Sequence, residues 1–565
     1  MKSKTRKMHT GPYREVTIAS LLTGIAIGVV MVASITYSGL VVGFTIVGSS
    51  IAAIAGFGIL RGILRRGTIV ENNIVQTVAS SLNVASAGVI FTVPVLYLRG
   101  EPFSLPTMVI ACISGSFLGF FFIIPLRKQM IDLERLRFPS GVAVATILRS
   151  PGAGLGKLAL LGAGIGAAAL ITVITQAMDT EVVDLNRWLV FIPKEFTNTW
   201  ALSLMCVGAG YLTGRNGILV LVGGILSYWI ITPAAIYMDW LPLGPHGSAT
   251  EMIDAAHKEI TRPMGIGMLV GGAVSGILVS LPAIRAAFAG LLRAKVKGGT
   301  EEMPAVLVGI GAAASFAVLL ATAMLTSDIS FLRALLIATV GTVWLALAGV
   351  VISQCTGMTD WSPISGISMM GVAIVMWLSG ENVVLSVTLG AAICMSLSQC
   401  SDIMQDLKTG FLVGAKPVRQ QAAQLAVTWI GPIVAMAVVY VLAQSQDFGT
   451  KALPAPQATA LSSTITAISG GEMPIVKYLS GLMIGGAVSI FGVPGLGVLI
   501  GLSMYLPMEY VLTYGLGCLI NMGVVHFKGG KWAEEKGLPV AAGFIVGEAL
   551  VSVVISMAKV LGGAQ

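Results

Sequence analysis

Charged residues are scarce in this chain of 565 residues. Lysine and arginine together number 34, aspartate and glutamate number 26, and charged residues make up 11% of the sequence against 55% for hydrophobic residues. A soluble domain carries about twice that share of charge, most of it on its surface. The composition therefore excludes a soluble globular protein and indicates a polytopic membrane protein.

Motifs for catalysis and metal binding are also missing. The six cysteines lie in or beside apolar runs without a CxxC pair, and the four histidines are scattered. The sequence contains no P-loop, HExxH or GxSxG motif. We therefore expect no metal site, no cofactor, no enzymatic activity and no nucleic-acid partner.

Period-two alternation of apolar and polar residues is absent as well, which argues against a transmembrane barrel. Apolar windows long enough to cross a bilayer recur from Val16 to Leu561. About fourteen windows reach roughly 20 residues, and two or three are shorter. The prediction is an all-α polytopic membrane protein with about 14–16 transmembrane helices, some of them re-entrant or broken, in two duplicated halves.

Basic residues collect in alternate loops, and the positive-inside rule then orients the chain. The tail 1–14 is basic, and the apolar run that follows it is too long for the core of a signal peptide. Further basic clusters lie near Arg65, Arg127, Arg285 and Lys416. We expect a multi-pass protein with a cytoplasmic N-terminus, and its compact loops favour the plasma (inner) membrane.

Similar blocks recur in the two parts of the chain. "MIDLERLRFPSGVAVAT" begins at Met130 and "MQDLKTGFLVGA" at Met404, while "EVTIASLLTG" from Glu15 resembles "EMPAVLVGIG" from Glu302. These echoes predict an internal duplication, with a first transmembrane half at 15–297 and a second at 298–565. Both halves would start on the basic side, which is typical of parallel repeats.

Glycine clusters beside proline or charge predict interrupted helices, whose free amides can face a ligand. The four clusters are "FPSGVAVA" at Phe138, "QCTGMTDWSPISG" at Gln354, "KTGFLVGAKP" at Lys408 and "FGVPGLGVLIG" at Phe491. Helix N-termini at two matched breaks would favour a carboxylate. The candidate substrate-binding residues are Ser140, Gly141, Thr409 and Gly410 at these breaks, with Gln76, Thr77, Tyr211, Gln399 and Ser401 as hydrogen-bonding neighbours.

Acids within or beside apolar spans are candidates for proton coupling, because a carboxyl group in a low-dielectric site holds a proton more readily than one in water. Glu548 is the deepest in its span, and Glu71 and Glu381 open spans, where capping a helix start is the alternative role. Asp402 and Asp406 with Lys408 read equally well as a solvated loop cluster.

Several blocks together resemble the oligopeptide transporter (OPT) superfamily, nearer its yellow stripe-like and prokaryotic branch. They are "PYREVTIASLLTGIAIGV", "ENNIVQTVASS", "RFPSGVAVATIL", "CSDIMQDLKTGFLVGAKP" and "LPVAAGFIVGEAL". The resemblance implies about sixteen helices made by duplication, and proton-coupled import of small peptides or of metals held by amino-acid-like chelators. The Asn-Pro-Gly signature of the fungal peptide branch is not found here.

The residues and the resemblance lead to one functional prediction. We expect a secondary active transporter that imports small oligopeptides by proton symport, with import of metal-chelate complexes as the alternative. A channel or a membrane-embedded enzyme fits less well, because the breaks concentrate at a few places and the acids lack histidine or cysteine partners. The expected partners are the small-molecule substrate, protons and the lipid bilayer, and a homodimer is left open.

Overall fold

A computed structural model gives the fold of the chain. It describes residues 14–561 apart from 44–47, 66, 150–153, 179, 181, 188–192, 194, 239, 241–248, 280–301, 360–361, 363, 471–474 and 492–495. The predicted N-terminal tail 1–14 and the basic loop near Arg285 lie almost wholly outside the described residues.

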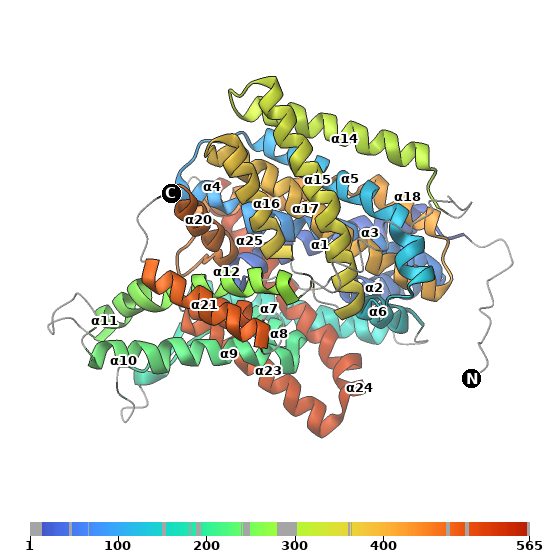
Figure 1. Cartoon of the computed structure of the whole chain (residues 1–565). Helices are drawn as coiled ribbons and strands as arrows, with labels where there is room; N and C mark the ends of the chain where they lie inside the picture. Colours follow the sequence, from blue (N-terminus) through green and yellow to red (C-terminus); the bar gives the residue numbers. More distant parts are fainter. Residues whose placement is uncertain are drawn as a thin grey trace.

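Helices make up nearly all of the described structure (Figure 1). The first group is α1 (Ile18–Val42), α2 (Ser49–Phe57), α3 (Ile69–Thr92), α4 (Pro94–Arg99), α5 (Leu105–Ile123), α6 (Pro139–Arg149), α7 (Gly154–Ala177), α8 (Leu204–Thr213), α9 (Ile218–Ile225), α10 (Thr232–Tyr237), α11 (Ala249–Ala256) and α12 (Arg262–Val279). The second group is α14 (Ala305–Thr326), α15 (Phe331–Thr359), α16 (Ile364–Ser379), α17 (Val383–Val413), α18 (Pro417–Val427), α19 (Ile430–Ser445), α20 (Pro456–Ile468), α21 (Ile475–Phe491), α22 (Leu496–Tyr505), α23 (Met508–Lys528), α24 (Gly530–Trp532) and α25 (Leu538–Leu561).

Short irregular helices and two strands complete the described elements. Strands β1 (Val182–Asp184) and β2 (Thr199–Ala201) pair antiparallel. The short 3₁₀ or π segments are η1 (Gly58–Ile63), η2 (Ile124–Leu126), η3 (Lys128–Leu133), η4 (Leu185–Arg187), η5 (Gly214–Gly217), η6 (Leu226–Ile231), η7 (His257–Thr261) and η8 (Ala533–Gly537).

The helix lengths confirm the all-α membrane fold. Within the described ranges, 11 helices are long and apolar enough to cross a membrane, and five shorter apolar helices accompany them. Burial separates central from peripheral spans. In the most apolar window, 89% of residues are buried for Val383–Val413 and 78% for Ile69–Arg99, against 17% for Ala305–Thr326. Helices α3 and α17 therefore form the centre, while α14 lies at the edge (Figure 1).

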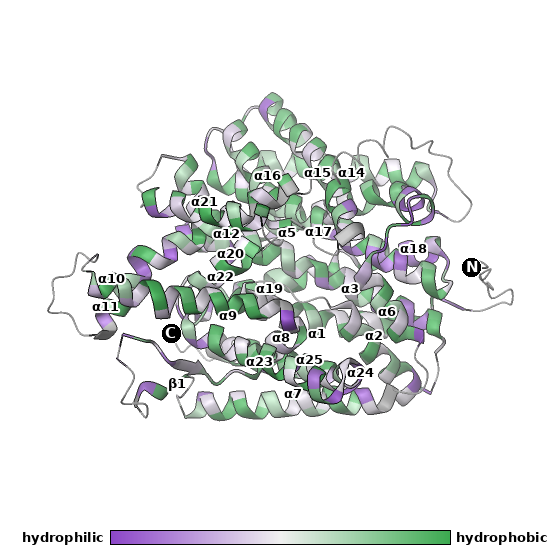
Figure 2. Ribbon diagram, turned by 60° about the horizontal axis from the view of Figure 1, so that its bottom comes forward, coloured by the Kyte–Doolittle hydropathy of each residue, from purple (hydrophilic) through white to green (hydrophobic). Residues whose placement is uncertain are grey.

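Helix packing groups the elements into two bundles. In one, α3 packs against α1, α17, α18 and α19, and α17 packs against α5, α15 and α16. In the other, α12 packs against α21 and α22, α25 against α7 and α8, and α23 against α8 and α9. Each bundle contains helices from both the first and the second part of the chain. Helix α7 lies at the rim of the molecule and is mostly hydrophobic (Figure 2). The division into duplicated halves at 15–297 and 298–565 stays a prediction.

Close helix contact explains several of the glycines in the spans. A side chain at Gly115 or Gly119 of α5 would collide with the backbone carbonyls of Ala392 or Ser396 on α17. Where lipid replaces water, such close backbone approach is a main source of helix association. These glycines let α5 pack closely against the central α17.

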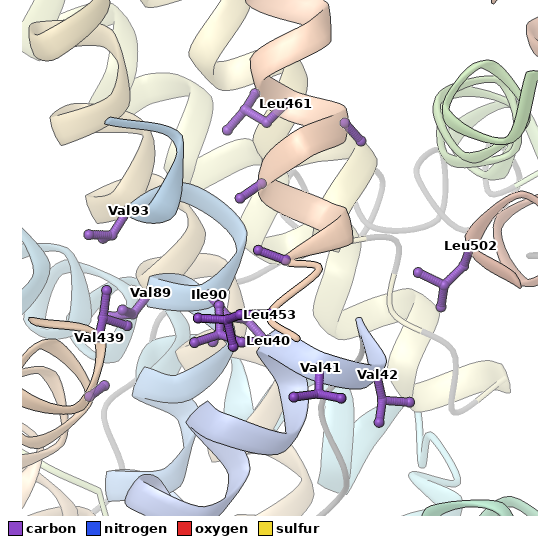
Figure 3. Close-up of a cluster of buried hydrophobic side chains, with 14 of the residues drawn as sticks. Leu40, Val41, Val42, Val89, Ile90, Val93, Val439, Leu453, Leu461 and Leu502 are labelled. Carbon is purple, nitrogen blue, oxygen red and sulfur yellow. The ribbon is translucent and has the colours of Figure 1, made fainter. Parts of the chain in front are cut away.

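An apolar cluster closes the C-terminal ends of α1 and α3 (Figure 3). It belongs to a larger buried core that also includes residues of α19, α20 and α22. The labelled members are Leu40, Val41, Val42, Val89, Ile90, Val93, Val439, Leu453, Leu461 and Leu502. The labelled side chains are all aliphatic, so they pack this end of the central helices together without hydrogen bonds of their own.

The predicted helix breaks are only partly present. Helix α6 follows Phe138, whose φ is +46°, and its 11 residues span about 16 Å, well short of a membrane of roughly 30 Å. By contrast, α17 runs without interruption to Val413 and ends at Gly414, which has a φ of +89°. The predicted break at Gly410 is wrong, because that glycine serves close packing against Gln420 inside the helix.

The two acids that begin the echoed blocks converge on one helix. Glu15 accepts hydrogen bonds from Lys416 N at 3.0 Å and Arg419 Nη1 at 3.2 Å. Glu302 accepts from Gln421 Nε2 at 2.8 Å and also pairs with Arg127. The starts of both blocks are thus fixed to α18 and its N-terminal residues, which places α18 beside the central helices.

Candidate functional site

Polar side chains gather between the central helices α3 and α17 and the short helix α18. We call this set the polar cluster, and it consists of Gln76, Thr77, Ser80, Ser81, Gln399, Asp402, Asp406, Gln420, Gln424 and Thr428. All but Asp402 are at most 2% exposed, and Asp402 is half-buried.

Helical spacing brings these side chains onto facing surfaces. Residues three, four or seven apart share one face of a helix, which aligns Gln399, Asp402 and Asp406 on α17, as well as Gln420 and Gln424 on α18. The start of α3 is fixed by a capping box in which Thr68 and Glu71 bond to each other's backbone N–H. Helix α18 starts with Pro417 at its first turn, where a missing N–H has no cost.

Hydrogen bonds join the three helices around two carboxyl groups. Ser80 Oγ donates to Asp402 Oδ1 at 2.7 Å. Gln424 Nε2 donates to Asp406 Oδ2 at 3.1 Å. Gln420 Nε2 lies 2.7 Å from both Thr77 Oγ1 and the backbone oxygen of Asp406. The donors around Asp402 and Asp406 are therefore neutral hydroxyl and amide groups.

A second set of hydrogen bonds lies about one helical turn from Asp402. Gln399 Nε2 donates to Ser81 Oγ at 3.2 Å, and Ser81 and Thr428 share a hydrogen bond of 2.8 Å. Ser49 of α2 reaches Ser80 at 2.8 Å. Gln76, Thr77 and Gln399, which the sequence pointed to as neighbours of the substrate, are thus brought together.

Acceptors outnumber donors among the unpaired buried atoms of this region. In the part of the chain described above, the buried oxygens without a hydrogen-bond partner include Gln76 Oε1, Asp402 Oδ2 and Gln424 Oε1. Neighbouring Asn73 has neither side-chain atom paired. Buried polar atoms without partners are costly, so the cluster is suited to a ligand or proton that brings donors.

The two matched blocks of sequence do meet in space. Thr409 Oγ1 donates to the backbone oxygen of Gly141 at 2.9 Å, and a side chain at Gly141 would press on Gln405 of α17. Ser140 lies in the first turn of α6, as expected. However, Thr409 and Gly410 lie near the C-terminal end of α17, so the expected helix N-terminus at Thr409 is wrong.

Two other predicted residues lie apart from the polar cluster. Ser401 faces the opposite side of α17, where it bonds to Thr356 at 3.0 Å and Ser362 at 3.1 Å. Tyr211 belongs to α8 in the other bundle, and its hydroxyl is buried against Gly537. The nine candidate substrate residues therefore do not form one site.

Glu548 lines a separate cavity between α1, α7, α8 and α25. Its Oε1 accepts from Ser203 Oγ at 2.6 Å and its Oε2 accepts from Met205 N at 2.8 Å, at the N-terminus of α8. The cavity has a volume of about 60 Å³, and Tyr37, Gln176 and Tyr510 also line it. This space, the Glu548 cavity, has room for a few water molecules.

The other two candidate proton carriers lie at helix starts. Glu71 Oε2 accepts from Thr68 N at 2.8 Å in the capping box of α3, which is the alternative role expected for it. Glu381 precedes α17 in the left-handed region, with a φ of +67°. The cap of α17 is instead Asn382, whose Oδ1 accepts from Leu385 N at 2.9 Å.

The sequence left open whether Asp402 and Asp406 lie in a solvated loop, and the structure places them in a helix. The charged segment reads as a loop because its composition resembles that of the true loops, but α17 continues through it. Asp406 is 2% exposed. The i, i+4 spacing of the two acids, one turn after Gln399, was the available signal for a polar helix face.

The fold and the site together define a polytopic membrane transporter, with spanning helices around buried polar groups. The chain belongs to the OPT oligopeptide transporter family, because the profile of "OPT oligopeptide transporter protein" matches residues 15–559. This finding confirms the family named from the sequence, and the branch stays a prediction.

Two named relatives agree with this family. The chain is 26% identical over 592 residues to a "Putative oligopeptide transporter" of Haemophilus influenzae, covering 92% of each protein. It is 29% identical over 156 residues to the "Putative oligopeptide transporter YGL114W" of Saccharomyces cerevisiae, covering 24% of this chain and 22% of the relative.

Proposed function

We propose that this transporter imports small oligopeptides by proton symport. The observation that carries the proposal is the polar cluster, where two carboxyl groups and unpaired acceptors are buried beside the central helices of a transporter. Acids inside membrane spans are expensive, and where they occur they mark ion and substrate pathways. Family membership and the names of the relatives support the peptide substrate.

The cluster lies deep within its helices. Ser80 is 11 residues after the start of α3 at Ile69, and Asp402 is 11 residues before the end of α17 at Val413. At 1.5 Å per residue both lie roughly 16 Å from those helix ends, which is about half of a hydrocarbon core of roughly 30 Å. A proton bound there would lie well inside the apolar spans of both helices.

The Glu548 cavity is our proposed contact for the substrate. A carboxylate lining a cavity attracts the ammonium group at the start of a peptide. The space of about 60 Å³ is far smaller than the 300 Å³ or more that enclose a ligand. The bundle of α7, α8 and α25 must therefore move to admit a peptide, which fits alternating access.

Uptake into proteoliposomes tests the function. The purified protein would receive an inward proton gradient and either a mixed pool of di- to pentapeptides or iron held by a nicotianamine-like chelator, each with and without an ionophore. We expect peptide accumulation that the ionophore abolishes. Accumulation of the chelate alone would contradict the peptide assignment, and accumulation that ignores the ionophore would contradict proton symport.

A further inference from the structure

Buried carboxyl groups in this protein are neutralised in different ways. Glu302 and Asp132 flank the buried guanidinium of Arg127, and Glu15 faces Arg419. Among the residues that the structure describes, no lysine, arginine or histidine forms an ion pair with Asp402 or Asp406. The negative charge of this pair is therefore not cancelled by a neighbouring cation.

Helical spacing places the two aspartates side by side. They lie one turn apart on the same face of α17, where residues four apart are neighbours with Cβ atoms about 5–6 Å apart, and Ser80 and Gln424 donate to them from α3 and α18. An ionised carboxylate has only acceptors, so a hydrogen bond between two carboxyl groups requires a proton on one of them. Two carboxylates at this separation cannot both be ionised at low cost.

Neutral groups face the pair from the neighbouring helices. Ser80 and Gln76 come from α3, and Gln424 from α18. Helices α2, α5, α14 and α16 contribute no charged residue. The charged side chains on the other packed segments have their own contacts: Glu71 caps α3, Arg419 pairs with Glu15, Arg149 donates to Leu412 O, Arg333 to Leu378 O, and Lys408 to Leu136 O.

Unpaired atoms point independently to a ligand that donates. Gln76 and Gln424 are both 0% exposed, and the side-chain oxygen of each has no partner within the described ranges. Asp402 Oδ2 is likewise buried and unpaired. A proton bound at Asp402 Oδ2 would remove one of these unpaired acceptors.

We propose that Asp402 and Asp406 share one exchangeable proton and form the site that binds the coupling proton of this transporter. This inference rests on the proposed function. Loading adds one proton to the pair and lowers its charge from two negative charges to one, and release restores the second. No bond to the substrate is made or broken. The pair replaces Glu548, Glu71 and Glu381 as our candidate proton carrier.

Infrared spectroscopy of the purified protein tests the pair without any substrate. We expect the wild-type protein to show the carbonyl band of a protonated carboxyl group at neutral pH, and Asp406→Asn to lose it. Asp402→Asn serves as a second variant, because either substitution removes one of the two carboxyl groups that share the proton. Absence of the band from the wild-type protein, or its persistence in both variants, would overturn the proposal.

Transport assays distinguish a loss of proton coupling from a loss of the folded protein. We expect Asp402→Asn and Asp406→Asn to keep peptide counterflow, which needs no gradient, and to lose accumulation driven by a proton gradient. Asp447→Asn, at an exposed acid in a loop, is the matched control and should keep both. Gradient-driven accumulation retained in both cluster variants would overturn the proposal. If the wild-type protein carries no peptide at all, the proposed function fails, while the infrared result still decides the proton site.

Discussion

The polar cluster and the Glu548 cavity hold buried acids in opposite surroundings. At Glu548, a hydroxyl and a backbone N–H at a helix N-terminus donate to the carboxylate, and both groups stabilise negative charge. At Asp402 and Asp406, two acids share a few neutral donors, and one oxygen is unpaired. The comparison teaches that a single deep acid is a poorer candidate for proton exchange than a pair that competes for donors.

Substitution of Arg127 should have the largest effect on stability, because this buried cation neutralises two carboxylates. It is 3% exposed and pairs with Asp132 and Glu302. Arg127→Met should lower the free energy of unfolding by about 3–5 kcal/mol, the usual cost of leaving buried charges unpaired. Thermal unfolding in detergent measures this, and Lys531→Met, at an exposed pair, is the control. Equal stability of the two variants would contradict the account.

Gly410→Ala should disturb the polar cluster by displacing Gln420. An added Cβ would collide with Gln420 Oε1, and Gln420 would lose its bonds to Thr77 and Asp406. We expect a loss of about 1–3 kcal/mol for the broken buried bonds, together with slower uptake. Gly166→Ala is the control, because nothing lies within 4 Å of that position. Unfolding and uptake like those of the control would show that the packing at Gly410 is not needed.

Glu548→Gln should weaken substrate binding and leave proton coupling intact. The amide keeps one acceptor and loses the negative charge that faces the cavity. We expect a half-saturation concentration roughly tenfold higher, equivalent to about 1.4 kcal/mol, with full sensitivity to the ionophore. Loss of that sensitivity would return the proton site to Glu548.

Tyr211→Phe should have the smallest effect. Its hydroxyl has no hydrogen-bond partner in the described structure and lies outside the polar cluster. Stability should stay within about 0.5 kcal/mol of the wild-type value, and uptake should be unchanged. A clear loss of peptide uptake would instead place Tyr211 in the substrate path, as its sequence context predicted.

Sequence patterns predicted the large features because these depend on sums over many residues. Long apolar windows identify membrane helices, and the helical fold and the family are confirmed. The short helix α6 at Ser140 was also foreseen from its proline and glycine. Each of these signals is local to one segment.

The polar cluster could not be assembled in the same way. Whether "SDIMQDLKTG" forms a loop or a buried helix depends on the surfaces that α3 and α18 present to it. For α3 this information is distant in sequence, because Ser80 and its partner Asp402 are 322 residues apart. Gly410 looked like a helix break because glycine serves both flexibility and close packing.

Proton movement during downhill peptide flux tests the division between the two sites most directly. Proteoliposomes with a pH-sensitive dye would receive a peptide gradient and no proton gradient. The account predicts that wild-type protein and Glu548→Gln carry protons with the peptide, while Asp406→Asn carries peptide alone. Proton movement with Asp406→Asn equal to that of the wild-type protein would contradict it.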